Sequence, residues 1–85
     1  MIYELIIPPK VKKILDKLNY NMKEKILKSL ERIRIRPYDY LERSTNSPYY
    51  KLRTGDYRAI IDIQDNKLII YVVKVGHRKN VYDNL

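Results

Sequence analysis

The residues best suited to chemistry stand in two stretches of the C-terminal half, KLRTGDYR and VGHRKNVY. Guanidinium groups such as those of Arg58 and Arg78 suit the binding of a crowded phosphate, because they donate paired hydrogen bonds and remain charged. A lysine among arginines, as Lys51 is, is a candidate general base. His77 is a candidate acid or base, because imidazole titrates near neutral pH. The two stretches therefore indicate chemistry on a phosphate.

Each of these residues also has an ordinary structural explanation. Arg58 alternates with apolar residues, as a solvated strand arginine would. His77 can fix the chain end by a hydrogen bond to the backbone, and Tyr82 can serve only as an anchor for the tail. Arg78 has no apolar periodicity to explain it, which favours a functional role.

Length and composition limit the class of protein. Eighty-five residues make one small domain, 1–85, with room for a modest core. Cysteine is absent and histidine occurs once, so disulfides are excluded, and neither a metal nor another cofactor is expected. The apolar stretches are far shorter than the roughly 20 residues of a membrane span, so a cytoplasmic protein is predicted.

The formal net charge of +8 is large for this length. It attracts polyanions, of which nucleic acid is the commonest in the cytosol. An acidic protein partner, or solubility alone, would also explain it. Seven lysines follow the predicted helices, either as their solvated face or as contacts to RNA phosphates: Lys10, Lys12, Lys13, Lys17, Lys23, Lys25 and Lys28.

The elements that must position these residues follow from the spacing of the apolar side chains. MIYELII reads as a short strand closed by Pro8-Pro9. Apolar residues then recur at helical spacing over 10–18 and again over 22–33, until Pro37 ends the pattern. Two short helices joined by a tight turn make a helical hairpin.

After the polar loop PYDYLERSTNSP the apolar period becomes two. This period predicts strands at 49–53, 57–64 and 67–75. The fold class is therefore α+β: an N-terminal strand, a helical hairpin and a three-stranded antiparallel meander, with the helices packed on one sheet face.

The turns predict which side chains share a face. If Asp65-Asn66 is a two-residue turn, Ile63 faces Leu68 and Tyr57 faces Lys74 on the helix-covered side. All of this set except Lys74 suits a core.

The other turn predicts a cluster of cations on the uncovered side. With a turn at Thr54-Gly55, Lys51 lies directly opposite Arg58, and Arg53 lies two residues along. Directly opposed like charges destabilise a sheet, so a bound anion is inferred. The antiparallel order brings these strand ends to one sheet edge, where the tail that carries Arg78 completes a cationic cleft.

KLRTGDYRAIIDI followed by VGHRKNVY closely resembles the RelE toxins of bacterial and archaeal toxin–antitoxin systems, within the RelE/ParE superfamily. The resemblance covers essentially the whole chain. It implies a ribosome-dependent mRNA endonuclease that cuts message in the ribosomal A site without a metal, by attack of the RNA's own 2′-hydroxyl on the adjacent phosphate. The implied partners are the ribosome, its mRNA and a RelB-like antitoxin, through which the complex can bind operator DNA.

The resemblance also implies roles for single residues. Lys51 matches a lysine near the attacking hydroxyl, Arg58 and Arg78 match arginines that hold the scissile phosphate, and Arg53 matches a further basic contact. Tyr82 matches a tyrosine that stacks on a base or assists proton transfer.

One position departs from the family pattern. Tyr49 stands where the best-known members have a lysine, so the resemblance does not identify the general base. Tyr49 and Lys79 are expected among the RNA contacts. Two alternatives remain: a ParE-like toxin that acts on DNA gyrase without nuclease activity, and a catalytically silent member that binds its antitoxin.

Overall fold

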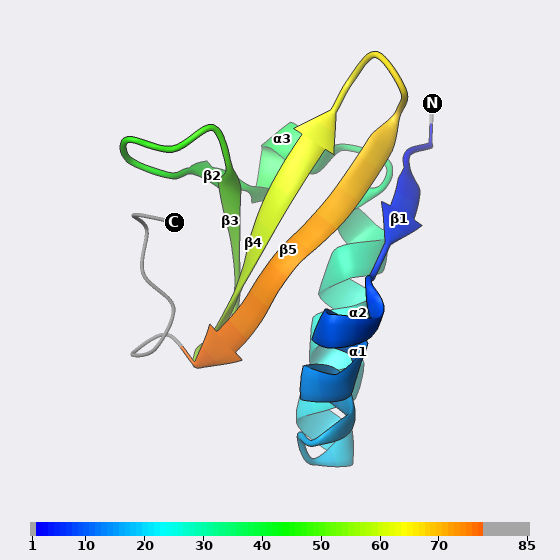
Figure 1. Cartoon of the computed structure of the whole chain (residues 1–85), viewed down its shortest axis with the longest axis vertical. Helices are drawn as coiled ribbons and strands as arrows, with labels where there is room; N and C mark the ends of the chain where they lie inside the picture. Colours follow the sequence, from blue (N-terminus) through cyan, green and yellow to red (C-terminus); the bar gives the residue numbers. More distant parts are fainter. Residues whose placement is uncertain (1, 78–85) are drawn as a thin grey trace.

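A sheet of five strands runs through the part of the chain that the computed structural model describes, residues 2–77 (Figure 1). The strands lie in the order β1-β5-β4-β3-β2, with β1 parallel to β5 and the other neighbours antiparallel. The predicted α+β class is confirmed. In chain order the elements are β1 (Glu4–Ile6), α1 (Pro9–Asp16), α2 (Tyr20–Ile33), α3 (Pro37–Tyr40), β2 (Glu42–Arg43), β3 (Tyr50–Thr54), β4 (Tyr57–Gln64) and β5 (Ile69–His77).

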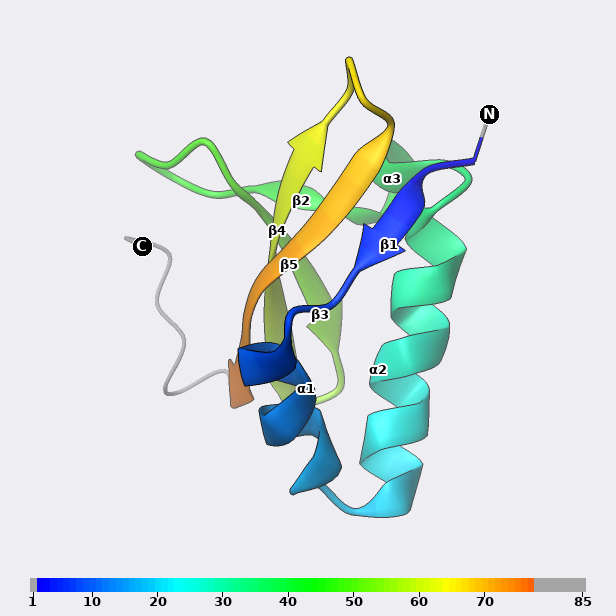
Figure 2. The same cartoon turned by 45° about the vertical axis from the view of Figure 1, so that its right-hand side comes forward.

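The helical hairpin of α1 and α2 begins and ends at residues that favour helix termini. Pro9 opens α1, where its missing N–H costs no intrahelical bond. The side chain of Asn19 accepts a hydrogen bond of 2.8 Å from the backbone N–H of Met22 and caps α2. Figure 2 shows the two helices side by side against the sheet.

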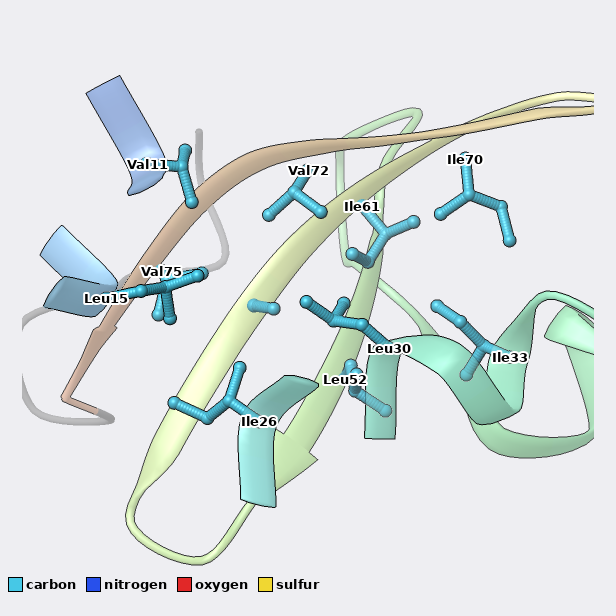
Figure 3. Close-up of a cluster of buried hydrophobic side chains, with 11 residues drawn as sticks. Val11, Leu15, Ile26, Leu30, Ile33, Leu52, Ile61, Ile70, Val72 and Val75 are labelled. Atoms are coloured by element: carbon cyan, nitrogen blue, oxygen red, sulfur yellow. The ribbon is translucent and has the colours of Figure 1, made fainter. Parts of the chain in front are cut away.

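The core lies between this hairpin and one face of β3, β4 and β5 (Figure 3). Alternate strand residues point into it, as period two requires. The buried residues of this cluster are Val11, Leu15, Ile26, Leu30, Ile33, Leu52, Ala59, Ile61, Ile70, Val72 and Val75.

The turn between β4 and β5 is longer than predicted. Ile63 pairs with Ile70 instead of Leu68, because residues 65–68 form the turn and Leu68 adopts a positive φ of 55°. The prediction of a two-residue turn at Asp65-Asn66 is therefore wrong. The faces of the strands are nevertheless as predicted at this end, because a shift of two residues preserves the alternation.

A β-bulge changes the register farther along the same hairpin. Ile61 pairs with Val72, whereas Ile60 pairs with Lys74, so Val73 is the extra residue of β5. The predicted pairing of Tyr57 with Lys74 on the covered face is wrong. The bulge turns Lys74 out of the core, where an ammonium group would be costly, and places Val75 there.

The turn between β3 and β4 is displaced by one residue from the prediction. Thr54 pairs with Tyr57, so Gly55-Asp56 is the two-residue turn. Gly55 has a φ of +58°, which the first central residue of a type II′ turn requires and glycine tolerates. This register contradicts the prediction that Lys51 lies opposite Arg58.

The segment predicted as a polar loop holds two short elements, α3 and β2. Three residues, here called the tyrosine clamp, fix α3 and the start of the chain to the β4–β5 turn. Asp65 accepts hydrogen bonds from the hydroxyls of Tyr3 at 2.7 Å and Tyr38 at 2.6 Å. These bonds lower the pKa of the Asp65 carboxyl and raise the pKa of both phenols.

Candidate nucleic-acid interface

The sheet face opposite the helices, here called the open face, carries most of the described candidate residues. Alternation along β3, β4 and β5 assigns its members, because their strand neighbours lie in the core. The side chains that matter for the site are Lys51, Arg53, Arg58, Ile60, Asp62, Tyr71 and Lys74.

The first row of this face is cationic. Arg53 on β3 pairs directly with Arg58 on β4, and Arg58 pairs with Gly76 on β5. Directly opposed like charges cost the sheet stability, and an anion bound between them would offset that cost. Arg53 has its Nε 3.6 Å from Oε1 of Glu42, but both side chains are more than half exposed and water screens the attraction. Gly76 adds no side chain to the row.

The second row adds two lysines, of which Lys51 is almost fully buried. Lys51 pairs with Ile60, and Ile60 pairs with Lys74 across the bulge. Lys51 is 7% exposed and Ile60 is 1% exposed, whereas Lys74 is half-buried. The two rows are two residues apart along β4, about 6.6 Å. One phosphate group between them would lie within reach of cations from both rows.

The edge of the sheet at this end gathers the strand termini, as predicted. Arg53 lies near the end of β3, Arg58 near the start of β4 and His77 at the end of β5, where His77 pairs with Tyr57. Three further candidates, Arg78, Lys79 and Tyr82, lie outside the described residues.

His77 belongs to the other face of the sheet. It pairs with Tyr57, which packs against the core, and the two rings meet edge to face with centroids 5.6 Å apart. This arrangement favours the structural explanation, in which His77 fixes the end of β5, over a role beside Arg58.

Tyr49 immediately precedes β3. Its backbone N–H donates to Oγ of Ser47 at 3.1 Å, and its carbonyl accepts from the backbone N–H of Ser44 at 3.0 Å. Tyr50 pairs with Ile61, so Tyr49 lies at the level of Asp62 on β4. These bonds fix the backbone of Tyr49 two residues from Lys51 of the second row.

Lys74 is the open-face cation that sequence reasoning did not include among the site residues. The sequence carries a signal for it, since Lys74 was the one predicted covered residue unsuited to a core. The bulge that resolves this conflict is a register change that the turns alone do not predict.

Neither a metal site nor a membrane segment is evident in residues 2–77. No set of three histidine, aspartate or glutamate side chains gathers there with the geometry of metal ligands. No helix of that range has the length and apolar character to cross a bilayer.

Comparison with known proteins gives a family and a fold. A family model for the ParE toxin of type II toxin–antitoxin systems, parDE, matches residues 5–82. A search of curated proteins finds no match.

Solved structures of RelE toxins are similar over nearly the whole chain. The toxin–antitoxin complex RelBE2 of Mycobacterium tuberculosis matches with a TM-score of 0.83 at 17% identity, over 92% of this chain and 100% of that chain. The archaeal RelE–RelB complex of Pyrococcus horikoshii matches with 0.78 at 23% identity, over 95% and 100%. A free E. coli RelE toxin with two arginines changed to alanine matches with 0.75 at 26% identity, over 93% and 86%.

Proposed function

The chain belongs to the RelE/ParE superfamily of toxins of type II toxin–antitoxin systems, and we propose that it is a ribosome-dependent mRNA endonuclease that inhibits translation. It would act in the cytoplasm on message in the ribosomal A site. A RelB-like antitoxin would neutralise it, as RelB accompanies RelE in several of the similar structures. The complex would bind operator DNA through that antitoxin.

The pairing of Arg53 with Arg58 on the open face is the observation that carries this proposal. Two directly opposed guanidinium groups repel each other, and a phosphate between them would turn that repulsion into charge-assisted hydrogen bonds. Lys51 and Lys74 in the next row add to the same positive field.

The reaction needs a proton acceptor, a stabilised phosphorane and a proton donor. The 2′-oxygen forms a bond to phosphorus and gives its proton to a base, while the bond from phosphorus to the 5′-oxygen breaks and that oxygen receives a proton. The products are a 2′,3′-cyclic phosphate and a 5′-hydroxyl. Guanidinium groups suit the crowded, doubly charged intermediate state, because their donors are fixed before the charge develops.

The residues take roles by position and by family resemblance. Arg58, with Arg78 from the segment beyond the described residues, would hold the scissile phosphate. Lys51 would lie near the attacking 2′-hydroxyl, Arg53 would contact the neighbouring backbone, and Tyr82 would stack on a base or assist proton transfer.

A gyrase-directed toxin is the second candidate function, and the match to the ParE family model favours it. ParE-type relatives generally lack the full basic and tyrosine set that this sequence carries. That set, together with the opposed arginines, supports our proposal of the nuclease over the gyrase-directed toxin.

In vitro translation with purified protein, followed by mapping of message ends on stalled ribosomes, tests the proposal. We expect A-site cuts with the wild type, none on free RNA, and a loss of about 100-fold or more with Arg58→Ala, the scale of losing one transition-state donor. Arg36→Ala is the matched control, because Arg36 is exposed directly before α3, away from the open face.

Two results would contradict the nuclease. Supercoiling inhibition by the pure protein with translation untouched would identify the gyrase-directed alternative. A folded protein that binds its antitoxin but affects neither process would be a silent member, and Tyr49 would be the first residue to examine.

A further inference from the structure

A third row crosses the open face beyond the two cationic rows. Asp62 on β4 pairs with Tyr71 on β5, and Tyr71 pairs with Ile6 on the parallel strand β1. Tyr49 lies at the same level on the other side of Asp62, one residue before β3. Asp62, Tyr71 and Tyr49 are all half-buried, so each retains exposed surface.

The carboxylate of Asp62 is out of keeping with the rest of the face. The two rows next to it along β4 are cationic, and a negative charge weakens the field with which they attract a polyanion. A carboxylate in an RNA-binding surface is useful where it meets a base, because amino groups of bases donate hydrogen bonds and phosphates do not.

Asp62 is already oriented for such a contact. Gln64, two residues along the same face of β4, donates from Nε2 to Oδ2 of Asp62 at 3.2 Å. This bond restrains the carboxylate, and two carboxylate oxygens have capacity for about four hydrogen bonds, so acceptor capacity remains for a ligand.

The rings beside Asp62 supply the second feature that a base requires. Unpaired bases are held between aromatic side chains, and the stacking tolerates any base because every base has a π-face. Tyr71 pairs with Asp62 on β4 and, on its other side, with the apolar residue Ile6 on β1. Stacking on tyrosine would give affinity, and the carboxylate would give selectivity.

The spacing connects this row with the proposed cleavage site. Asp62 lies two residues beyond Ile60 and four beyond Arg58 along β4, about 6.6 Å and about 13 Å at strand rise. An extended nucleotide whose phosphate lies between the cationic rows can therefore bring a base to the level of Asp62.

We propose that Asp62, Tyr71 and Tyr49 form a base-binding subsite that selects bases carrying an amino group over uracil. The subsite rests on the proposed nuclease function and adds its substrate preference. An amino group of cytosine, adenine or guanine donates to the Asp62 carboxylate. Uracil has no amino group, and its one ring donor, N3–H, lies between two carbonyl oxygens that repel the carboxylate.

Codon preference in the ribosomal cleavage assay tests the subsite. The assay uses a set of messages that differ only in the base at one A-site codon position. Cleavage of each message is measured with the wild type, with Asp62→Asn and with the control Asp39→Asn. At one position the wild type should prefer amino-bearing bases over uracil by about tenfold, the scale of one good base contact. Asp62→Asn should abolish that preference, because an amide also donates to the carbonyl oxygens of uracil.

The matched control makes the same charge change away from the face. Asp39 is exposed on α3, and its substitution should leave the preference as in the wild type. Tyr71→Leu is a second variant, which should lower cleavage of all codons about tenfold through lost stacking.

The outcomes separate the subsite from the nuclease. If Asp62→Asn slows all codons equally, or leaves the preference unchanged, Asp62 acts on the cationic rows or on the fold, and the subsite is wrong while the nuclease stands. If the wild type cuts no message at all, the proposed function fails and the subsite fails with it.

Discussion

At the scale of single residues, Lys74 depends most directly on the bulge for its place on the open face. It pairs with Ile60 in the second cationic row, where it can contact RNA phosphate but reads no base. We expect Lys74→Gln to lower A-site cleavage about tenfold on every codon and to reduce the logarithmic salt slope by about one. Cleavage rates over a series of salt concentrations measure both effects.

Lys67→Gln controls for the change in net charge, because Lys67 is exposed in the β4–β5 turn. If the two variants show the same rates and salt slopes, Lys74 contributes only to the general field of the molecule and contacts no phosphate.

At the scale of elements, the tyrosine clamp makes the attachment of β1 and α3 depend on pH. Hydrogen bonds from Tyr38 and Tyr3 hold the pKa of Asp65 below its ordinary value of about 3.9. A lowered folded-state pKa gives stability that is present above about pH 4 and lost as the pH falls through the folded value. The raised phenol pKa values act at the alkaline end, where stability is lost as the pH rises beyond about 10.

Asp65→Asn should therefore be less stable than the wild type at about pH 7 and should lose less stability on acidification to about pH 2.5. Urea unfolding at a series of pH values measures this. Asp56→Asn, in the exposed turn between β3 and β4, is the control. Parallel acid profiles for the wild type and Asp65→Asn would show that the clamp is not formed in solution.

The elements also show how far a sequence can predict this fold. The helices, the strand faces and the shared edge of strand ends follow from period and polarity, which survive a register shift of two residues. Two features did not follow from the sequence: the bulge at Val73, and the parallel pairing of β1 with β5. The β1–β5 pairing joins segments far apart in the chain, and the bulge is a register change within the β4–β5 hairpin that its turn does not predict. The four-residue helix α3 and the two-residue strand β2 are too short for a periodic signal.

The candidate site was predicted only in part, because the register of the β3–β4 hairpin differs from the predicted one. The sequence correctly indicated that cations oppose one another across β3 and β4, but the turn at Gly55-Asp56 makes Arg53, not Lys51, the partner of Arg58. A shift of one residue in the position of the turn decides this pairing. Lys51 and Arg53 are both basic and only two residues apart, so the sequence alone could not decide which of them pairs with Arg58.

At the scale of the whole molecule, the net charge of +8 and the cationic open face imply an acidic partner that covers this face. A small domain gains stability from any ligand that binds the folded state alone, by about 2.7 kcal/mol when the free ligand is at 100 times its Kd. We expect a cognate RelB-like antitoxin to cover the open face with acidic and apolar segments. Adding it should raise the Tm of the toxin, and added salt should reduce the gain.

Charge reversal on and off the open face distinguishes binding of the antitoxin to this face from general attraction between opposite charges. Arg53→Glu places a negative charge on the open face, whereas Arg36→Glu makes the same change at an exposed position directly before α3. Arg53→Glu should lose much of the increase in Tm and Arg36→Glu should keep it, because only the first opposes an acidic segment at close range. Equal losses would mean that the antitoxin senses net charge alone, and no change in Tm with the wild type would mean that the antitoxin does not bind the folded toxin.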